Sequence, residues 1–126
     1  MANILVAEDE RDIRELINFT LTFAGHQVTM AENGEEAVQK AQEVLPDLIM
    51  MDVRMPKLTG YEACRKIKEI ETTKDIPVVF LTAKGQDEEI TAGIEVGAIA
   101  YILKPFELDK LTEQINEILT KIGHGR

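Results

Sequence analysis

The sequence contains one cysteine, no tryptophan and no apolar run near the roughly 20 residues that a membrane-spanning helix needs. The lone Cys64 cannot form a disulfide within the chain, which excludes a disulfide-stabilised secreted fold and favours a reducing cytoplasm. The short apolar start lacks the basic flank of a secretion signal. Basic residues are scarce, since 14 Lys and Arg stand against 23 Asp and Glu for a net charge of −9. We therefore expect no direct binding to nucleic acid or to a membrane.

Two hydrophobic periodicities alternate along the chain. Five short apolar runs, typical of strands covered on both faces, alternate with segments in which apolar residues recur every three or four positions, typical of helices. The expected strands are 4–7, 28–31, 48–51, 78–81 and 100–103. The fourth expected helix contains Ile90, Ile94 and Val96 and ends at Gly97. The pattern predicts an α/β fold with a doubly wound five-stranded parallel sheet and five helices, formed by residues 1–122 and followed by a flexible tail, 123–126.

Polar residues stand where the expected strands end. They are Glu8 and Asp9 after the first strand, Asp52 after the third, Thr82 after the fourth and Lys104 after the fifth. In doubly wound sheets, ligands bind beyond the carboxyl ends of the strands. The sequence therefore predicts that these side chains gather at one edge of the sheet.

Three carboxylates at one edge raise one another's pKa values unless positive charge lies among them. Mg²⁺ binds carboxylate oxygens, water and phosphate in octahedral geometry, so the three acidic residues are candidate metal ligands. An aspartate between a metal ion and a lysine is a candidate covalent phosphoryl acceptor, and Asp52 and Lys104 fit those positions. The Thr82 hydroxyl and the Ala83 backbone N–H are candidate hydrogen-bond donors to the phosphoryl group.

These residues fall in four stretches that together resemble the response-regulator receiver family of two-component systems over essentially the full length. The stretches are 4–10 (ILVAEDE), 47–56 (DLIMMDVRMP) with Gly60, 77–83 (PVVFLTA) and 101–106 (YILKPF). The resemblance implies a flavodoxin-like three-layer sandwich with strand order 2-1-3-4-5. It also implies a phosphoaspartate switch that assists only its own phosphorylation and dephosphorylation, and not an enzyme.

The resemblance further implies a role for each site residue. Asp52 would accept a phosphoryl group from a phosphohistidine on a sensor histidine kinase or a phosphotransfer protein. The ligands of Mg²⁺, for which Mn²⁺ is the expected substitute, would be Glu8, Asp9, Asp52 and the backbone carbonyl of Arg54. The residues that contact the phosphoryl group would be Thr82, Ala83 and Lys104.

The implied switch couples Thr82 to Tyr101, which would move from exposed to buried on phosphorylation. The face formed by the fourth helix, the fifth strand and the fifth helix would then present a changed surface to an output partner or domain of unknown identity. The Lys104–Pro105 peptide would be cis, an isomer that is inexpensive only before proline.

Two departures from the family pattern limit what carries over. Glu8 stands where many members have aspartate, which keeps the charge but lengthens the side chain. Ile99 and Ala100 stand where the subfamily that dimerises through the same face has an acidic pair. We therefore expect a monomer, with a phosphorylation-dependent dimer as the alternative. The regulator either stands alone or is the receiver part of a longer regulator.

Arg54 and Lys84 each lie two residues past a site residue, at the expected mouth of the pocket. In the family these positions influence how easily water reaches the acyl phosphate. Two long cationic side chains there would shield the phosphoryl group and slow its hydrolysis. The alternative is that both are solvated surface charges.

Three other functions fit the strand ends less well. A dinucleotide- or flavin-binding domain needs a loop rich in Gly or hydroxyl groups after the first strand, where this chain has Glu8-Asp9-Glu10. An aspartyl-phosphate phosphatase would carry its nucleophile after the first strand in an Asp-x-Asp pattern, which is missing. A receiver fold that has lost phosphorylation would not be expected to keep all the site residue types.

Overall fold

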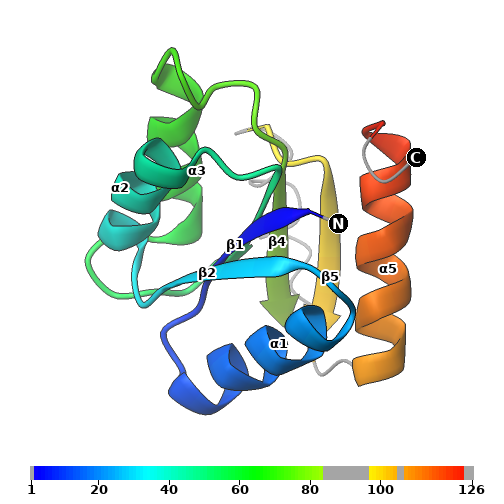
Figure 1. The fold of residues 1–126 in the computed structure, drawn as a ribbon. Helices are drawn as coiled ribbons and strands as arrows, with labels where there is room; N and C mark the ends of the chain where they lie inside the picture. Colours follow the sequence, from blue (N-terminus) through cyan, green and yellow to red (C-terminus); the bar gives the residue numbers. More distant parts are fainter. Residues whose placement is uncertain (1, 84–96, 105–106, 124–126) are drawn as a thin grey trace.

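The computed structural model describes residues 2–83, 97–104 and 107–123 and contains one five-stranded parallel sheet (Figure 1). The strand order is β2-β1-β3-β4-β5, which confirms the predicted doubly wound fold. The strands are β1 (Asn3–Ala7), β2 (Gln27–Ala31), β3 (Leu48–Asp52), β4 (Val78–Ala83) and β5 (Ala100–Lys104). The helices are α1 (Arg11–Phe23), α2 (Gly34–Val44), α3 (Gly60–Glu69) and α5 (Leu108–Lys121). The expected fourth helix falls in 84–96, outside the described residues.

Helices cover both faces of the sheet. Figure 1 shows α2 and α3 on one side and α1 and α5 on the other. Each side has its own buried core, one centred on Phe80 and Met51 and the other on Leu81 and Met50. Adjacent strand residues alternate between the two cores because successive side chains of a strand point to opposite faces.

The burial of the strands explains their composition. Every residue of β3 is buried, and so are Ile4 to Ala7 of β1. A strand covered on both faces needs apolar residues at every position, so it shows a continuous apolar run and not alternation. No helix among the described residues is long and apolar enough to cross a membrane.

Local signals fix the starts and ends of the helices. Gly25, directly after the C-cap of α1, has φ 98°, a left-handed conformation that glycine adopts without strain. The Asn33 side chain accepts a hydrogen bond of 2.8 Å from the Glu36 N–H and caps α2. A capping box between Thr59 and Glu62 starts α3. The Asn33 and Thr59 caps belong to loops at the carboxyl edge of the sheet, whereas Gly25 lies at the opposite edge, before β2 begins.

Candidate functional site

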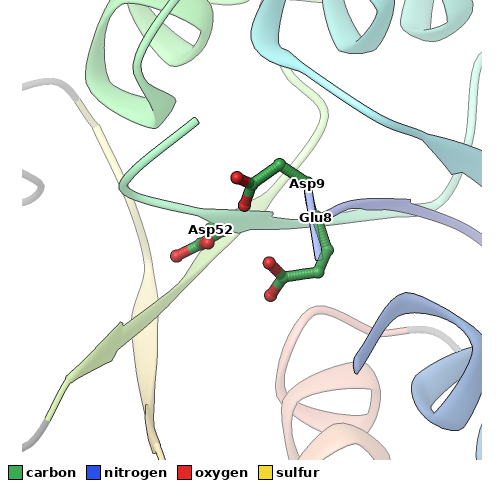
Figure 2. Close-up of side chains that lie close together, drawn as sticks. All are labelled: Glu8, Asp9 and Asp52. Atoms are coloured by element: carbon green, nitrogen blue, oxygen red, sulfur yellow. The ribbon is translucent and has the colours of Figure 1, made fainter. Parts of the chain in front are cut away.

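Three carboxylates converge at the carboxyl edge of the sheet. Glu8 and Asp9 follow β1, and Asp52 is the last residue of β3 (Figure 2). Each offers an oxygen, and these oxygens lie within 4.8 Å of one another. The pairing of Ala7 with Met51 brings the strands together at this point. The structure therefore confirms the predicted proximity of the three acidic residues.

The two-residue alternation of the strands also brings Lys104 to the cluster. Glu8, Asp52 and Lys104 each follow by two positions a residue of the core beneath α1 and α5. Those three core residues are Val6, Met50 and Ile102. The Lys104 Nζ lies 2.9 Å from Glu8 Oε1 and 3.3 Å from Asp52 Oδ2. Lys104 therefore forms an ion pair with both buried carboxylates.

Burial and charge perturb the ionisation of this cluster. Glu8 has no exposed surface, and burial raises its pKa to about 7, partly offset by the hydrogen bond from Lys104 and reinforced by the charge of Asp52. Burial alone would lower the pKa of Lys104, but its hydrogen bond to Glu8 and the charge of Asp52 outweigh burial and raise it. The cluster is thus short of positive charge, because one ammonium faces three carboxylates.

The donor set fits a hard divalent cation. Ligand oxygens around Mg²⁺ lie about 3 to 4 Å apart, given its metal–oxygen distance of about 2.1 Å and octahedral geometry. Oxygens of Glu8, Asp9 and Asp52 within 4.8 Å of one another need only small side-chain adjustments to reach that arrangement. Asp9 is exposed, so a cation can enter from solvent. These three residues could hold Mg²⁺ and leave positions for water and a phosphoryl oxygen.

The loop after β3 begins over the Asp52 carboxylate. The Arg54 N–H lies 3.5 Å from Asp52 Oδ1, and the Gly60 N–H donates to the Val53 carbonyl at 2.8 Å. A Cβ at Gly60 would lie 2.4 Å from the Asp52 carbonyl oxygen, and a Cβ at Gly34 would lie 2.2 Å from the Leu58 carbonyl oxygen. Both glycines are needed for the loop to pack this closely. The Arg54 side chain is exposed, and its carbonyl as a metal ligand stays a prediction.

Arg14 is a site residue that the sequence reasoning missed. Its Nη1 donates to the carbonyls of Glu8 at 2.9 Å and Asp9 at 3.4 Å, and its Nη2 lies 3.6 Å from Glu32 Oε1. The guanidinium therefore fixes the backbone of the acidic pair. A basic residue one turn into the helix after an acidic strand end is the only sequence signal, and such residues are common without this role.

The remaining predicted site residues lie on β4 and β5. Thr82 is fully buried near the end of β4, and Ala83 pairs with Lys104 across to β5. Tyr101 pairs with Phe80 and is half-buried, with the two ring centroids 6.2 Å apart. Lys84 and Pro105 lie outside the described residues, so the expected shielding by Lys84 and the expected cis peptide are not addressed by the structure.

A family model for the response regulator receiver domain matches residues 4–116 of the chain. The chain belongs to the response regulator receiver family. This confirms the family that the sequence resemblance indicated.

Named relatives of this receiver include transcriptional regulators. It is 40% identical over 122 residues to the phosphate regulon transcriptional regulatory protein PhoB of Pseudomonas aeruginosa, covering 97% of the receiver and 53% of PhoB. It is 35% identical over 121 residues to the DNA-binding dual master transcriptional regulator RpaA of Synechocystis, covering 96% of the receiver and 50% of RpaA. The chain thus spans about half the length of these relatives.

Among solved structures, the chemotaxis response regulator CheY4 of Vibrio cholerae resembles the receiver with a TM-score of 0.89 and 34% identity, covering 94% of this chain and 99% of CheY4. Two-component phosphoacceptor signalling is therefore the activity class to which the site belongs.

Proposed function

We propose that Asp52 accepts a phosphoryl group from a phosphohistidine on a sensor histidine kinase or a phosphotransfer protein, and that this switches the receiver surface. The observation that carries the proposal is the position of Asp52, whose carboxylate lies beside Asp9 and Glu8 and within 3.3 Å of the Lys104 ammonium. The receiver promotes its own phosphorylation and dephosphorylation and does not act on a separate substrate.

In the transfer step, an Asp52 carboxylate oxygen attacks phosphorus in line, and the bond from phosphorus to the donor nitrogen breaks with its electron pair. The donor imidazole keeps that pair and leaves neutral after taking up a proton. Lys104 balances negative charge on the transferred group, because its raised pKa keeps it protonated at neutral pH. Mg²⁺, held by Glu8, Asp9, Asp52 and the Arg54 carbonyl, or Mn²⁺ in its place, would supply charge neutralisation and alignment of the phosphoryl oxygens.

The switch follows from the new oxygens on Asp52. A phosphoryl group offers three strong acceptors, so the Thr82 hydroxyl and the Ala83 N–H donate to it. Movement of Thr82 frees space next to Tyr101, which turns inward from its half-buried position against Phe80. The surface that includes β5 and α5 then differs between the two states, and a partner that prefers one state shifts the balance.

The proposed biological setting is cytoplasmic, with residues 1–122 as the receiver unit and a monomer as the resting state. A phosphorylation-dependent dimer is the alternative. The output is a partner protein or an attached domain, and the named relatives that are transcriptional regulators favour control of transcription through such an output. The receiver itself, with its net charge of −9, makes no direct contact with nucleic acid in this proposal.

Incubation with Mg²⁺ and acetyl phosphate, followed by intact mass and peptide mapping, tests the phosphoacceptor. We expect one hydroxylamine-labile phosphate on Asp52 in the parent, none without the metal, and none in Asp52→Asn. The matched control is Asp75→Asn, which neutralises an exposed aspartate far along the chain and should be phosphorylated like the parent. A parent that stays unmodified, or a phosphate at another residue, would identify a receiver fold that has lost this chemistry.

Thr82→Ala tests the switch separately from the acceptor. This variant should take up phosphate on Asp52, because Thr82 neither attacks nor holds the metal. The NMR signals of the Tyr101 ring should then shift much less on phosphorylation than in the parent. Equal shifts in both proteins would remove Thr82 from the switch.

The proposed shield against hydrolysis consists of Arg54 and Lys84. Arg54 lies among the described residues, and its side chain is exposed. Arg54→Asn should shorten the lifetime of the phosphorylated state, measured as the decay of the phosphorylated mass after removal of acetyl phosphate. An unchanged lifetime would leave Arg54 as an ordinary exposed charge.

A further inference from the structure

Glu8 and Asp9 are adjacent in the chain, yet their carboxylates reach the same point. Successive side chains of a strand point to opposite faces, so two adjacent residues in strand conformation cannot share one ligand. The chain bends at Asp9, shortly after β1 ends at Ala7, and Figure 2 shows both carboxylates turned toward Asp52. The convergence of this acidic pair therefore depends on a turn of the backbone between β1 and α1.

Arg14 binds both carbonyls of this turn with one nitrogen. Its Nη1 donates to the Glu8 carbonyl at 2.9 Å and to the Asp9 carbonyl at 3.4 Å. Successive carbonyls of a strand also point in opposite directions, so one donor reaches both only where the chain has turned. The two hydrogen bonds are therefore made in the same backbone conformation that brings the two carboxylates together.

The Arg14 side chain is itself held in place. Only 11% of it is exposed, and the Arg14 backbone N–H donates to the Glu10 carbonyl at 2.9 Å in the first turn of α1. Its Nη2 lies 3.6 Å from Glu32 Oε1, in the segment between β2 and α2. A guanidinium presents its donors in a rigid fork, so an arginine with little freedom can fix the shape of the backbone that it binds.

The positive charge of Arg14 would have the opposite effect on a bound cation. A guanidinium that binds the carbonyls of two proposed metal ligands lies close to the acidic cluster and repels a divalent ion there. If Arg14 acted only through its charge, its removal would tighten the binding of Mg²⁺. If Arg14 acts by holding the turn, its removal weakens binding, as the loss of an outer-shell partner does at other metal sites. The sign of the change therefore separates the two roles.

We propose that Arg14 is a positioning residue for Mg²⁺, which holds the turn at Glu8 and Asp9 so that two adjacent carboxylates reach one cation. This role rests on the proposed metal-dependent phosphorylation of Asp52. Arg14 acts through the backbone of the two acidic residues and not by contact with the cation or the phosphoryl group. The metal affinity of the site is thus set in part by a side chain that lies outside the acidic cluster.

Titration of Mg²⁺ into the ¹⁵N-labelled full chain, followed through the amide signals of the acidic cluster, measures the affinity without phosphorylation. Arg14→Met should weaken Mg²⁺ binding about tenfold. The matched control is Arg11→Met, which removes the same charge from a side chain that is 78% exposed and pairs with Glu15 in the same helix. The control should change the affinity by less than about twofold.

Two further measurements separate positioning from general damage. In metal-free protein, the ¹³C signals of the Glu8 and Asp9 carbonyls should move in Arg14→Met and keep their parental positions in Arg11→Met. With acetyl phosphate as the donor, Arg14→Met should need about tenfold more Mg²⁺ for half-maximal phosphorylation. Its rate at saturating Mg²⁺ should fall by less than about twofold, because the acceptor aspartate and its lysine are unchanged.

A milder substitution keeps the charge. Arg14→Lys replaces the fork of donors by a single ammonium, so its affinity for Mg²⁺ should be about threefold weaker than that of the parent and tighter than that of Arg14→Met. If Arg14→Met does not fold, Arg14→Lys carries the test, with Arg11→Lys as its control and an expected change there of less than about twofold.

Contrary results would be specific. Binding of Mg²⁺ by Arg14→Met at or above the parental affinity would mean that Arg14 acts through its charge. Equal weakening in Arg11→Met, or a loss of rate in Arg14→Met that saturating Mg²⁺ does not restore, would mean that Arg14 does not position the metal ligands. These results overturn the role of Arg14 and leave the proposed function standing, whereas a parent that binds no Mg²⁺ overturns both.

Discussion

The bodies of the strands and the carboxylates of Glu8 and Asp52 at their carboxyl ends are similarly buried but chemically opposite. Leu5 in the body of β1 and Glu8 directly after this strand are both 0% exposed. Met51 and Asp52 are neighbours on β3, at 0% and 6%. In the strand bodies burial removes apolar surface from water and stabilises the fold, whereas at the ends burial removes charges from water and costs free energy.

Among the described residues, the buried charged side chains are Glu8 and Asp52, and both lie at the carboxyl edge of the sheet. The cost at Glu8 is visible in its raised pKa, and the Lys104 ion pairs offset it only in part. Perturbed pKa values cluster at functional sites, so the raised pKa of Glu8 agrees with a chemical role for this edge of the sheet. Substitutions in the two regions should therefore change the free energy of unfolding by amounts that differ in size, in sign and in their dependence on pH.

The largest expected effect is in the strand bodies. Phe80→Ala should lower the free energy of unfolding by about 3 to 5 kcal/mol, because Phe80 is fully buried and packs against Tyr61 and Tyr101. Phe23→Ala makes the same change at an 85% exposed position and should alter stability by no more than about 0.5 kcal/mol. Urea denaturation of the three proteins measures both values. A loss at Phe80 below about 1 kcal/mol would mean that the core repacks around the gap.

At the strand ends, the expected effect depends on pH. Lys104→Met leaves Glu8 and Asp52 without their cation and should cost about 3 kcal/mol at pH 8 without metal. At pH 5 the loss should fall to about 1 kcal/mol, because Glu8, with its pKa of about 7, is then protonated. The control Lys74→Met breaks an exposed pair with Glu71 and should cost no more than about 0.5 kcal/mol at either pH. Equal losses at pH 5 and pH 8 would contradict the buried-charge account.

The strand bodies and the strand ends were predictable from sequence to different degrees. Continuous apolar runs predicted the strands, and the rule for doubly wound sheets predicted that Glu8, Asp9, Asp52 and Lys104 meet. Which groups pair within the cluster was not predictable. The Lys104 ammonium lies closer to Glu8 than to Asp52, and this depends on side-chain length and on two-residue alternation through three strands.

Contacts between distant backbone and side chains escaped prediction altogether. The hydrogen bonds from Arg14 to the carbonyls of Glu8 and Asp9 depend on the direction of α1 relative to the sheet. No spacing rule in the sequence determines that direction. The exposure of Phe19 and Phe23 was also not predicted, because α1 has apolar residues on both of its faces and this obscures the helical periodicity of the buried ones. The capping box of Thr59 and Glu62 differs from these contacts, because it is local and the pattern T-x-x-E signals it in the sequence.

A smaller change in stability with pH is expected from Glu8 alone. Its folded pKa of about 7 lies above the ordinary 4.5, so the protein binds an extra proton on folding between these values. Glu8 thus contributes stability that is fully present below pH 4.5 and is lost as pH rises through 7. Metal-free parent should lose on the order of 2 kcal/mol over this window relative to Glu8→Gln, whose position 8 does not titrate.

Thermal or urea unfolding of both proteins from pH 4.5 to pH 8 measures this difference. Saturating Mg²⁺ should reduce the loss in the parent, because the cation binds the ionised carboxylates of the folded state. Parallel pH profiles for the parent and Glu8→Gln in the absence of metal would show that Glu8 ionises normally.

The smallest expected effect concerns a polar residue at the same edge that serves the fold and not the chemistry. Asn33 follows β2, and its side chain is occupied by the 2.8 Å hydrogen bond from the Glu36 N–H. Asn33→Ala should cost about 1 kcal/mol of stability, and Asn33→Asp, which keeps the cap, should cost much less. Both variants should bind Mg²⁺ and accept phosphate on Asp52 at the parental rate. A slower rate in Asn33→Ala alone would mean that the cap of α2 also positions the acidic cluster, since Gly34 at the start of this helix packs against the loop that follows Asp52.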